Sequence, residues 1–189
     1  IQGATRLALA VILTRRSTIR HSADTDNDGN DAALDPAIVL PDWPPNERKA
    51  LLERPLFGFA SYGRVRFHHR SITEYLASVH LRNLRKKGMP ISALKRLLFA
   101  ETKGKVIVRP SKRPLAGWLA LSESRVFELL RDNEPSILLN EGDPQSLTLG
   151  QRNQALRSFV RRYSDGGWRG LSVPNIQIQR FASPQLAPE

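Results

Sequence analysis

The stretch Arg64–Leu84 constrains the fold more than any other part of the sequence, because its hydrophobic period changes in the middle. Its first half alternates as a strand does, which predicts His69 on the same inward face as Val65 and Phe67. From Ser71 onward, apolar residues recur about every 3.6 positions, as on one face of a helix. The residues of this face are Ile72, Tyr75, Leu76 and Val79. The sequence therefore predicts a strand that runs directly into a helix.

Both ends of this predicted helix carry boundary signals. Ser71 and Glu74 have the spacing of a capping box, in which each side chain accepts a hydrogen bond from the other residue's backbone amide. The far end has the basic residues, glycine and proline that are typical of a helix C-terminus, namely Lys86, Lys87, Gly88 and Pro90. We therefore expect the helix to span residues 72–86.

Residues 1–88 are expected to form a winged-helix-like domain. Residues 1–16 and 47–54 have helical hydrophobic spacing, and the prolines of 36–46 indicate an extended connector that Trp43 holds to the core. Strand-like runs at 56–60 and 64–69 predict a hairpin in which Gly63 adopts a positive φ. In such a domain the hairpin would be the wing.

Residues 89–189 are expected to form an α-helical, repeat-like domain that is truncated at the C-terminus. Its predicted helices lie at 91–100, 114–119, 122–131, 135–139 and 149–163. Ser122 is expected to cap one of them, and Thr148 with Gln151 forms a second box-like start. Short amphipathic helices need neighbours to cover them, which suggests stacked helical hairpins at the start of an α-solenoid. The predicted fold class is mainly α, with a small β-hairpin.

Composition and charge narrow the class of protein. The chain has 189 residues, 40% of them hydrophobic, and contains no cysteine, which excludes disulfides and thiolate metal sites. Most of its net charge of +11 lies in a basic block, Arg82–Arg113, which holds eleven Lys or Arg against one acidic residue, Glu101. Such a block can contact phosphates, although a solvated helix face or an acidic partner within the chain explains it equally well.

The sequence contains no segment with the length of a membrane span or the charge order of an export signal, so a cytoplasmic location without membrane partners is expected. The chain opens on Ile1 inside an apparent helix and ends as though another helix were beginning. We interpret it as a piece of a longer protein.

Residues 24–35 carry part of a calcium-loop pattern. The run Asp24–Gly29 fits the first half of such a loop, and Asp35 falls at the twelfth position. However, Asp31 occupies the normally aliphatic eighth position, and Pro36 follows where a second helix should continue. We therefore interpret the segment as a solvated acidic loop and predict no metal site.

No self-contained active site is recognisable. The motifs of a P-loop, a dinucleotide-binding loop, a zinc protease and a serine hydrolase do not occur. The four histidines (His21, His68, His69 and His80) lack the spacing and carboxylate neighbours of a zinc site, and His80 is expected on the surface. An inward His69 beside a helix N-terminus would lie where phosphate oxygens bind. The residues alone favour the alternative, a core histidine bonded to a backbone carbonyl.

The sequence at Phe67–Ala77, FHHRSITEYLA, resembles the F-x-H-x-[ST]-x-x-E-[FY]-L-A motif of the winged-helix segment in NACHT-type STAND NTPases. It is most similar to the large bacterial members of that family. Residues 40–43 (LPDW), 56–57 (LF) and 113–120 (RPLAGWLA) are also similar to that bacterial group. The resemblance covers residues 1–160 and is strongest at 65–77.

The resemblance implies a part in a molecular switch. In this family a P-loop ATPase core holds ADP in the resting state, and the winged-helix segment closes over the nucleotide. The motif histidine contacts the β-phosphate of the nucleotide, and by position that residue is His69. Ser71 and Glu74 match the motif but are explained as capping residues. The P-loop, magnesium-binding and sensor residues would lie upstream of Ile1, so this chain is expected to be no enzyme by itself.

Two functions from different classes follow from these patterns. The first is a non-catalytic regulatory segment of a signalling ATPase, with the upstream ATPase core as its partner, ADP or ATP with magnesium bound by the parent protein, and a homo-oligomeric full-length protein. The alternative is a winged-helix nucleic-acid-binding module that uses the basic block. The helix before the hairpin suits that alternative poorly, because Glu47 and Glu53 offset Arg48, Lys49 and Arg54.

Overall fold

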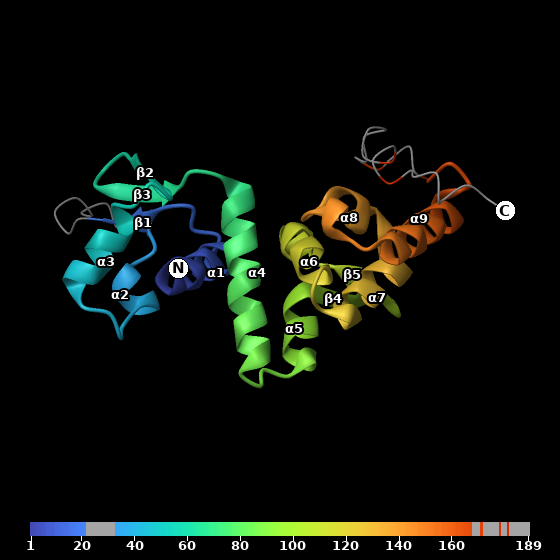
Figure 1. Ribbon diagram of the computed structural model, residues 1–189, viewed down its shortest axis with the longest axis horizontal. Coiled ribbons are helices and arrows are strands. Elements are labelled where there is room, and N and C mark those ends of the chain that lie inside the picture. Colours follow the sequence, from blue (N-terminus) through green and yellow to red (C-terminus); the bar gives the residue numbers. More distant parts are fainter. Residues whose placement is uncertain (22–32, 168–170, 172–177, 179–180, 182–189) are drawn as a thin grey trace. The chain divides into compact units, whose positions relative to one another are not determined.

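The computed structural model describes residues 1–21 and 33–167, together with Leu171, Ile178 and Phe181 (Figure 1). It is mainly helical with small antiparallel sheets, which confirms the predicted fold class. Contacts divide the chain into two compact units, which we call the N-terminal unit (Ile1–Leu84) and the C-terminal unit (Arg85–Glu189). The sequence predicts this boundary a few residues later, between residues 88 and 89.

The N-terminal unit contains, in order, a helix, a strand, two short helices, a hairpin and a long helix. These elements are α1 (Gln2–Thr14), β1 (Ile19–Arg20), α2 (Pro36–Val39), α3 (Pro45–Leu52), β2 (Phe57–Ala60), β3 (Arg64–Phe67) and α4 (Arg70–Lys86). The three strands form one antiparallel sheet in the order β1-β3-β2. Strands β2 and β3 are the predicted hairpin.

Strand β1 was not predicted, because two residues are too short to show a hydrophobic period. Pairing with β3 creates it: Ile19 lies opposite Val65, and the amide of His21 donates to the carbonyl of Gly63 at 2.9 Å. Gly63 has a φ of 61°, as predicted for the hairpin turn.

The core of the N-terminal unit lies between the helices and one face of the sheet. Phe57 and Phe67 face each other across the hairpin with ring centroids 4.6 Å apart. Gly3 of α1 allows two side chains to approach closely, since a Cβ there would lie 2.7 Å from Leu51 and 2.8 Å from Trp43. The connector before α3 is therefore held to the core through Trp43, as the sequence predicted. Its predicted extended conformation is wrong at 36–39, where Asp35 caps the short helix α2 and Pro36 takes the first helical position.

Helix α4 buries a different face from the one that its periodicity predicted. Its fully buried residues are Thr73, Ala77, Ser78 and Leu81, whereas Ile72, Leu76 and Val79 of the predicted stripe are half-buried and Tyr75 is exposed. Both buried hydroxyls are satisfied within the helix, because Thr73 donates to the His69 carbonyl at 3.2 Å and Ser78 to the Tyr75 carbonyl at 2.6 Å. Small residues with satisfied hydroxyls let a helix approach its neighbours more closely than a row of large apolar side chains does.

The C-terminal unit contains five helices and one hairpin within its described residues. They are α5 (Ile91–Leu98), β4 (Phe99–Thr102), β5 (Lys105–Val108), α6 (Arg113–Ala120), α7 (Ser124–Asn133), α8 (Pro135–Asn140) and α9 (Leu149–Tyr163). Single 3₁₀ turns, η2 (Pro110–Lys112) and η3 (Pro144–Ser146), precede α6 and α9. Helices α6 to α9 pack on one another around buried leucines such as Leu119, Leu130 and Leu139.

The β4–β5 hairpin corrects the prediction of an α-helical domain over residues 89–189, and the helix expected over 91–100 ends at Leu98, directly before β4. Its turn is Lys103-Gly104, with φ values of 50° and 71°, and Thr102 pairs with Lys105. Two central residues with positive φ match the right-handed twist of the flanking strands. The Lys103-Gly104 turn therefore favours a hairpin at this point, whereas the β-branched run Val106–Val108 is too short to predict a strand by itself.

The two predicted helix caps of this unit have opposite outcomes. At α9, the Thr148 hydroxyl accepts from the Gln151 amide at 3.2 Å, and the Gln151 side chain accepts from the Thr148 amide at 3.0 Å, which confirms the capping box. The cap at Ser122 is wrong, because α7 begins at Ser124 and Glu123 holds the N-cap position. Ser122 instead closes the end of α6, where its amide donates to the Leu119 carbonyl at 3.1 Å.

Among the described residues, no helix combines the length and the apolar character needed to cross a bilayer.

Candidate functional site

The candidate site lies where strand β3 gives way to helix α4. Pairing with β2 ends at Phe67, and His68 forms a bend whose amide still donates to the Leu56 carbonyl at 3.3 Å. His69 follows outside the strand and is exposed. The predicted inward orientation of His69 is therefore wrong, because strand alternation ends two residues before it. Its exposure also contradicts the alternative prediction of a core histidine.

The backbone of His69 stands at the start of α4. Its carbonyl accepts hydrogen bonds from the Thr73 amide and the Thr73 hydroxyl, both at 3.2 Å. The amides of Arg70, Ser71 and Ile72 precede this first helical bond, so they have no partner carbonyl in the preceding turn. Such amides and the positive end of the helix dipole favour an anion.

The predicted capping box of Ser71 and Glu74 is wrong. The helix begins at Arg70, so Ser71 is already inside its first turn and exposed. Glu74 accepts instead from the Nε atom of Arg70 at 2.7 Å, an ion pair between positions i and i+4. The start of α4 therefore carries the imidazole of His69, the guanidinium of Arg70 and, one turn later, the carboxylate of Glu74.

His68 packs on the hairpin. A Cβ atom at Gly58 of β2 would lie 2.7 Å from Cε1 of the His68 ring, so the absence of a side chain at Gly58 leaves the space that this ring occupies. The centroids of the His68 and His69 rings are 6.4 Å apart. The two neighbouring imidazoles thus have different surroundings. The His68 ring packs on Gly58 of β2, whereas His69 directly precedes the first residue of α4.

The remaining histidines lie elsewhere in the N-terminal unit. His80 is half-buried, with Nδ1 at 3.5 Å from the Thr5 hydroxyl, so its predicted surface position is wrong. Nε2 of His21 lies 3.5 Å from a carboxylate oxygen of Glu53. Within the described part of the chain, no group of three or more His, Asp or Glu side chains could hold a metal ion.

The calcium-loop pattern falls largely outside the described residues, at 24–32. Its last position, Asp35, is engaged in the fold. Its Oδ1 accepts from the amide of Ala37 at 2.8 Å and caps α2, and its Oδ2 lies 3.3 Å from the guanidinium of Arg20.

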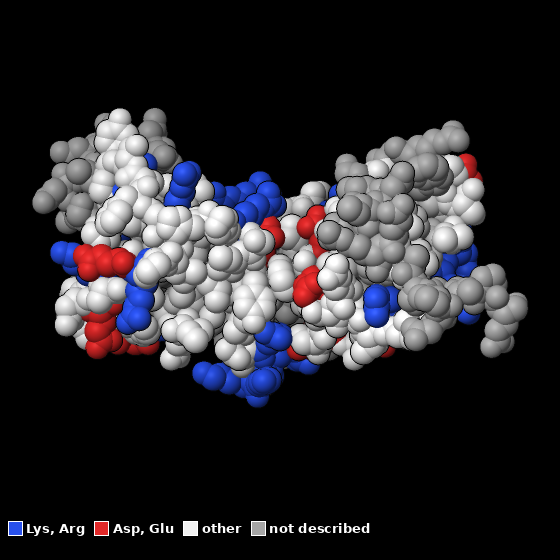
Figure 2. All heavy atoms as spheres, turned by 45° about the horizontal axis from the view of Figure 1, so that its top comes forward, with Lys and Arg blue, Asp and Glu red and all other residues white. Residues whose placement is uncertain are grey.

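The basic block is divided between paired and exposed cations. Arg85 pairs with Glu123 at 3.3 Å, Arg113 pairs with Glu134 at 3.0 Å, and Lys112 is buried. Figure 2 shows Lys and Arg side chains gathered at the lower edge of the view, where the turn between α4 and α5 lies in Figure 1. Lys86 and Lys87 enter this turn and are exposed.

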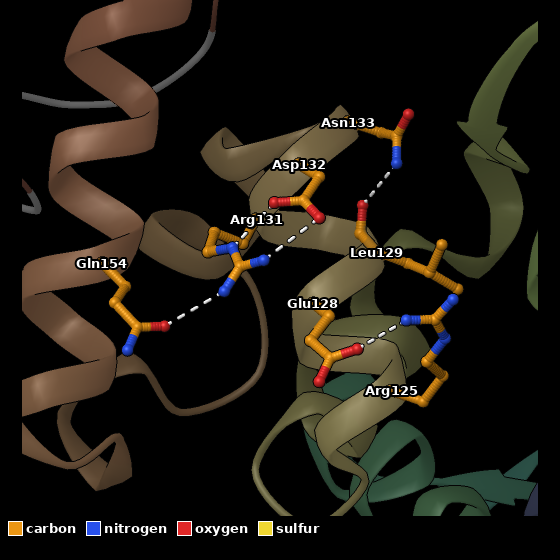
Figure 3. A network of polar contacts seen from close by, with 7 residues as sticks. All are labelled: Arg125, Glu128, Leu129, Arg131, Asp132, Asn133 and Gln154. Atoms are coloured by element: carbon orange, nitrogen blue, oxygen red, sulfur yellow. Dashed lines mark hydrogen bonds and ion pairs between the residues drawn. The ribbon is translucent and has the colours of Figure 1, made fainter.

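A second polar cluster, which the sequence analysis did not identify, joins α7 to α9. Arg131 of α7 binds Asp132 through Nε at 2.7 Å and a second nitrogen at 3.1 Å, and its third nitrogen donates to Gln154 of α9 at 3.2 Å (Figure 3). The hydrogen bond to Asp132 is the main reason that the pKa of Arg131 is raised. The sequence feature that could have indicated this cluster is the composition of α9, which has four arginines and no acidic residue.

No family model, curated protein or solved structure matches this chain.

Proposed function

We propose that this chain is a non-catalytic regulatory segment of a bacterial STAND ATPase of the NACHT type. In this proposal the N-terminal unit is a winged-helix lid, and the C-terminal unit begins a helical sensor region. The ATPase core and the magnesium-bound nucleotide belong to the parent protein, which is a cytoplasmic signalling or defence switch that forms homo-oligomers. The chain itself supplies a contact to ADP rather than a catalytic group.

The observation that carries the proposal is the exposed His69 immediately before α4. An imidazole there can donate to a phosphate oxygen, and the first amides of α4 and the guanidinium of Arg70 lie within one helical turn of it. A histidine kept for core packing would be buried, and His69 is not. The resemblance at Phe67–Ala77 assigns the nucleotide contact to the same residue.

The test is ADP retention and basal signalling of the complete protein that carries this chain, with the wild type beside His69→Ala. Loss of a hydrogen bond to a charged phosphate should weaken ADP binding by about 1–3 kcal/mol and raise basal signalling, because the closed state loses part of its stabilisation. His68→Ala is the matched control, since it removes the same kind of ring from the neighbouring exposed position.

The outcome that contradicts the proposal is equally specific. If His69→Ala binds ADP as the wild type does, or if His68→Ala weakens ADP binding to the same degree, His69 makes no distinct phosphate contact. The lid assignment would then have only the element order of the N-terminal unit to support it.

The second candidate function is nucleic-acid binding. It is favoured by the exposed lysines at the α4–α5 turn and at the tip of the β4–β5 hairpin, where Lys103 and Lys105 are also exposed. It is disfavoured by α3, because Arg48 donates to the Leu40 carbonyl at 3.2 Å and Lys49 lies 4.0 Å from Glu53. A helix whose cations are engaged within the protein offers little to a phosphate backbone.

The two functions predict different salt dependence. Nucleic-acid binding through lysines should weaken steeply as salt rises, because each phosphate contact releases a counterion. Nucleotide binding that appears only together with the upstream ATPase core would favour the regulatory function instead.

A further inference from the structure

The C-terminal unit has a depression of about 270 Å³ between α7 and α9. Five residues line it, of which Arg131 and Asp132 belong to α7 and Ser158, Arg161 and Arg162 belong to α9. Three guanidinium groups and one carboxylate give this lining a net positive charge. The depression shares no residue with the His69 site.

The α7 wall of the depression is fixed by its own hydrogen bonds. All three nitrogens of the Arg131 guanidinium are engaged, two by Asp132 and one by Gln154 (Figure 3). Both carboxylate oxygens of Asp132 accept from Arg131, so the negative charge of Asp132 is already matched. The hydrogen bond to Gln154 links this wall to α9 one turn before Ser158.

The α9 wall is different, because its donors have no such partners within the part of the chain that the structure describes. Ser158, Arg161 and Arg162 share one face of the helix by their i, i+3 and i+4 spacing. Neither Arg161 nor Arg162 has a carboxylate within ion-pair distance among the described residues, and α9 itself contains none. Two guanidiniums and a hydroxyl therefore line this depression, and the single carboxylate among its described lining residues, Asp132, is already paired.

We propose that the α7–α9 depression binds a phosphate group. A phosphate presents several oxygens that guanidinium groups can bind in pairs, through short charge-assisted hydrogen bonds. Arg161 and Arg162 supply these bonds and Ser158 supplies a further donor. The Arg131–Asp132 pair forms the opposite wall, where the guanidinium matches the charge of the carboxylate and so limits its repulsion of the phosphate. The phosphate can come from a free anion or from a phosphorylated side chain, since both present the same oxygens.

The test is a calorimetric titration of the 189-residue chain at constant ionic strength. Inorganic phosphate and a phosphoserine peptide are titrated separately, and the dissociation constant is measured for each. The double variant Arg161→Gln/Arg162→Gln should bind at least about tenfold more weakly than the wild type, as expected when two charge-assisted hydrogen bonds are lost. Arg157→Gln is the matched control, because it removes one exposed charge from the same helix without touching the lining. It should change the affinity by about twofold at most.

A charge-conserving variant separates binding geometry from net charge. Arg161→Lys/Arg162→Lys keeps both charges but loses the planar fork, so it should still bind several-fold more weakly than the wild type. Tighter binding of the phosphoserine peptide than of inorganic phosphate would support a phosphorylated side chain as the source, and equal binding would support a free anion.

Three results would overturn the proposal. The first is no binding of either probe at millimolar concentration. The second is an effect of Arg157→Gln as large as that of the double glutamine variant, which would mean that the whole arginine-rich surface of α9 attracts anions without a site. The third is wild-type affinity in the double lysine variant, which would show that charge alone accounts for the binding.

Discussion

Gly117 of α6 lies against the backbone that follows α8. A Cβ atom at Gly117 would lie 2.7 Å from the carbonyl carbon and oxygen of Glu141, and one at Gly142 would lie 2.6 Å from the carbonyl carbon of Gly117. Gly142 also has a φ of 74°, in the region that favours glycine. Both obstacles are backbone atoms, which cannot rotate away as a side chain can.

We expect Gly117→Ala to destabilise the chain by about 1–3 kcal/mol, the usual cost of overpacking in a close contact. The measurement is the free energy of unfolding from urea titration. Gly150→Ala is the matched control, because it is also a helical glycine but its Cβ would have no neighbour within 4 Å. The control should be neutral or stabilise by up to about 1 kcal/mol. Equal stability of the two variants would contradict the close contact.

At the scale of the element, the N-termini of α7 and α9 show which predicted capping residues reach an N-cap position. Thr148 and Ser122 both carry a hydroxyl at an expected helix start, yet of the two only Thr148 caps a helix. Thr148 has Gln151 three positions later to complete a capping box, whereas Ser122 has Arg125 there. The preceding segments also differ. η3 ends two residues before Thr148 and leaves it extended, with a ψ of 159°, whereas Ser122 is still part of the turn that closes α6.

Thr148→Ala should therefore destabilise the C-terminal unit by about 0.5–2 kcal/mol, because the Gln151 amide in the first turn of α9 loses the hydroxyl that accepts its hydrogen bond. Ser122→Ala should change the free energy of unfolding by less than about 0.5 kcal/mol, as expected of an exposed residue outside a cap. Thermal or urea unfolding of both variants checks this. A larger loss in Ser122→Ala than in Thr148→Ala would reverse the assignment.

At the scale of the whole molecule, the excess of positive charge should make the folded state less stable at acidic pH. The chain carries a net charge of +11, so protonation of its carboxylates adds to an existing repulsion. Several of these carboxylates also hold elements together. Asp42, after α2, pairs with Arg6 of α1 at 2.6 Å, and Arg6 donates in addition to the Val39 carbonyl at 2.7 Å.

The pKa of Asp42 is lowered, chiefly by the hydrogen bond from Arg6. A carboxyl group with a lower pKa in the folded state stabilises that state above its unfolded pKa, near 3.8, and this contribution is lost as the pH falls through the folded value. We therefore expect Asp42→Asn to reduce the difference in stability between pH 5 and pH 3, measured by urea unfolding at each pH. An unchanged difference would mean that the pair with Arg6 contributes nothing to the acid response.

Much of the fold follows from the sequence alone. The change of period within Arg64–Leu84 predicted the hairpin and the long helix, because strand and helix spacing depend only on local backbone geometry. The box at Thr148 and the positive φ of Gly63 were predictable for the same reason. His69 could also be selected from the sequence, through the position of its motif.

The orientation of the residues was decided by tertiary packing. His69 points outward because pairing with β2 stops at Phe67, an event that depends on a second strand. Helix α4 buries Thr73 and Ala77 because their small side chains permit close packing, which a hydrophobic period cannot register. The α7–α9 depression likewise exists only because folding brings together two helices that are distant in the sequence, as the Arg131–Gln154 hydrogen bond shows over 23 positions. Local spacing thus determined the elements, and contacts between distant residues determined which faces they present.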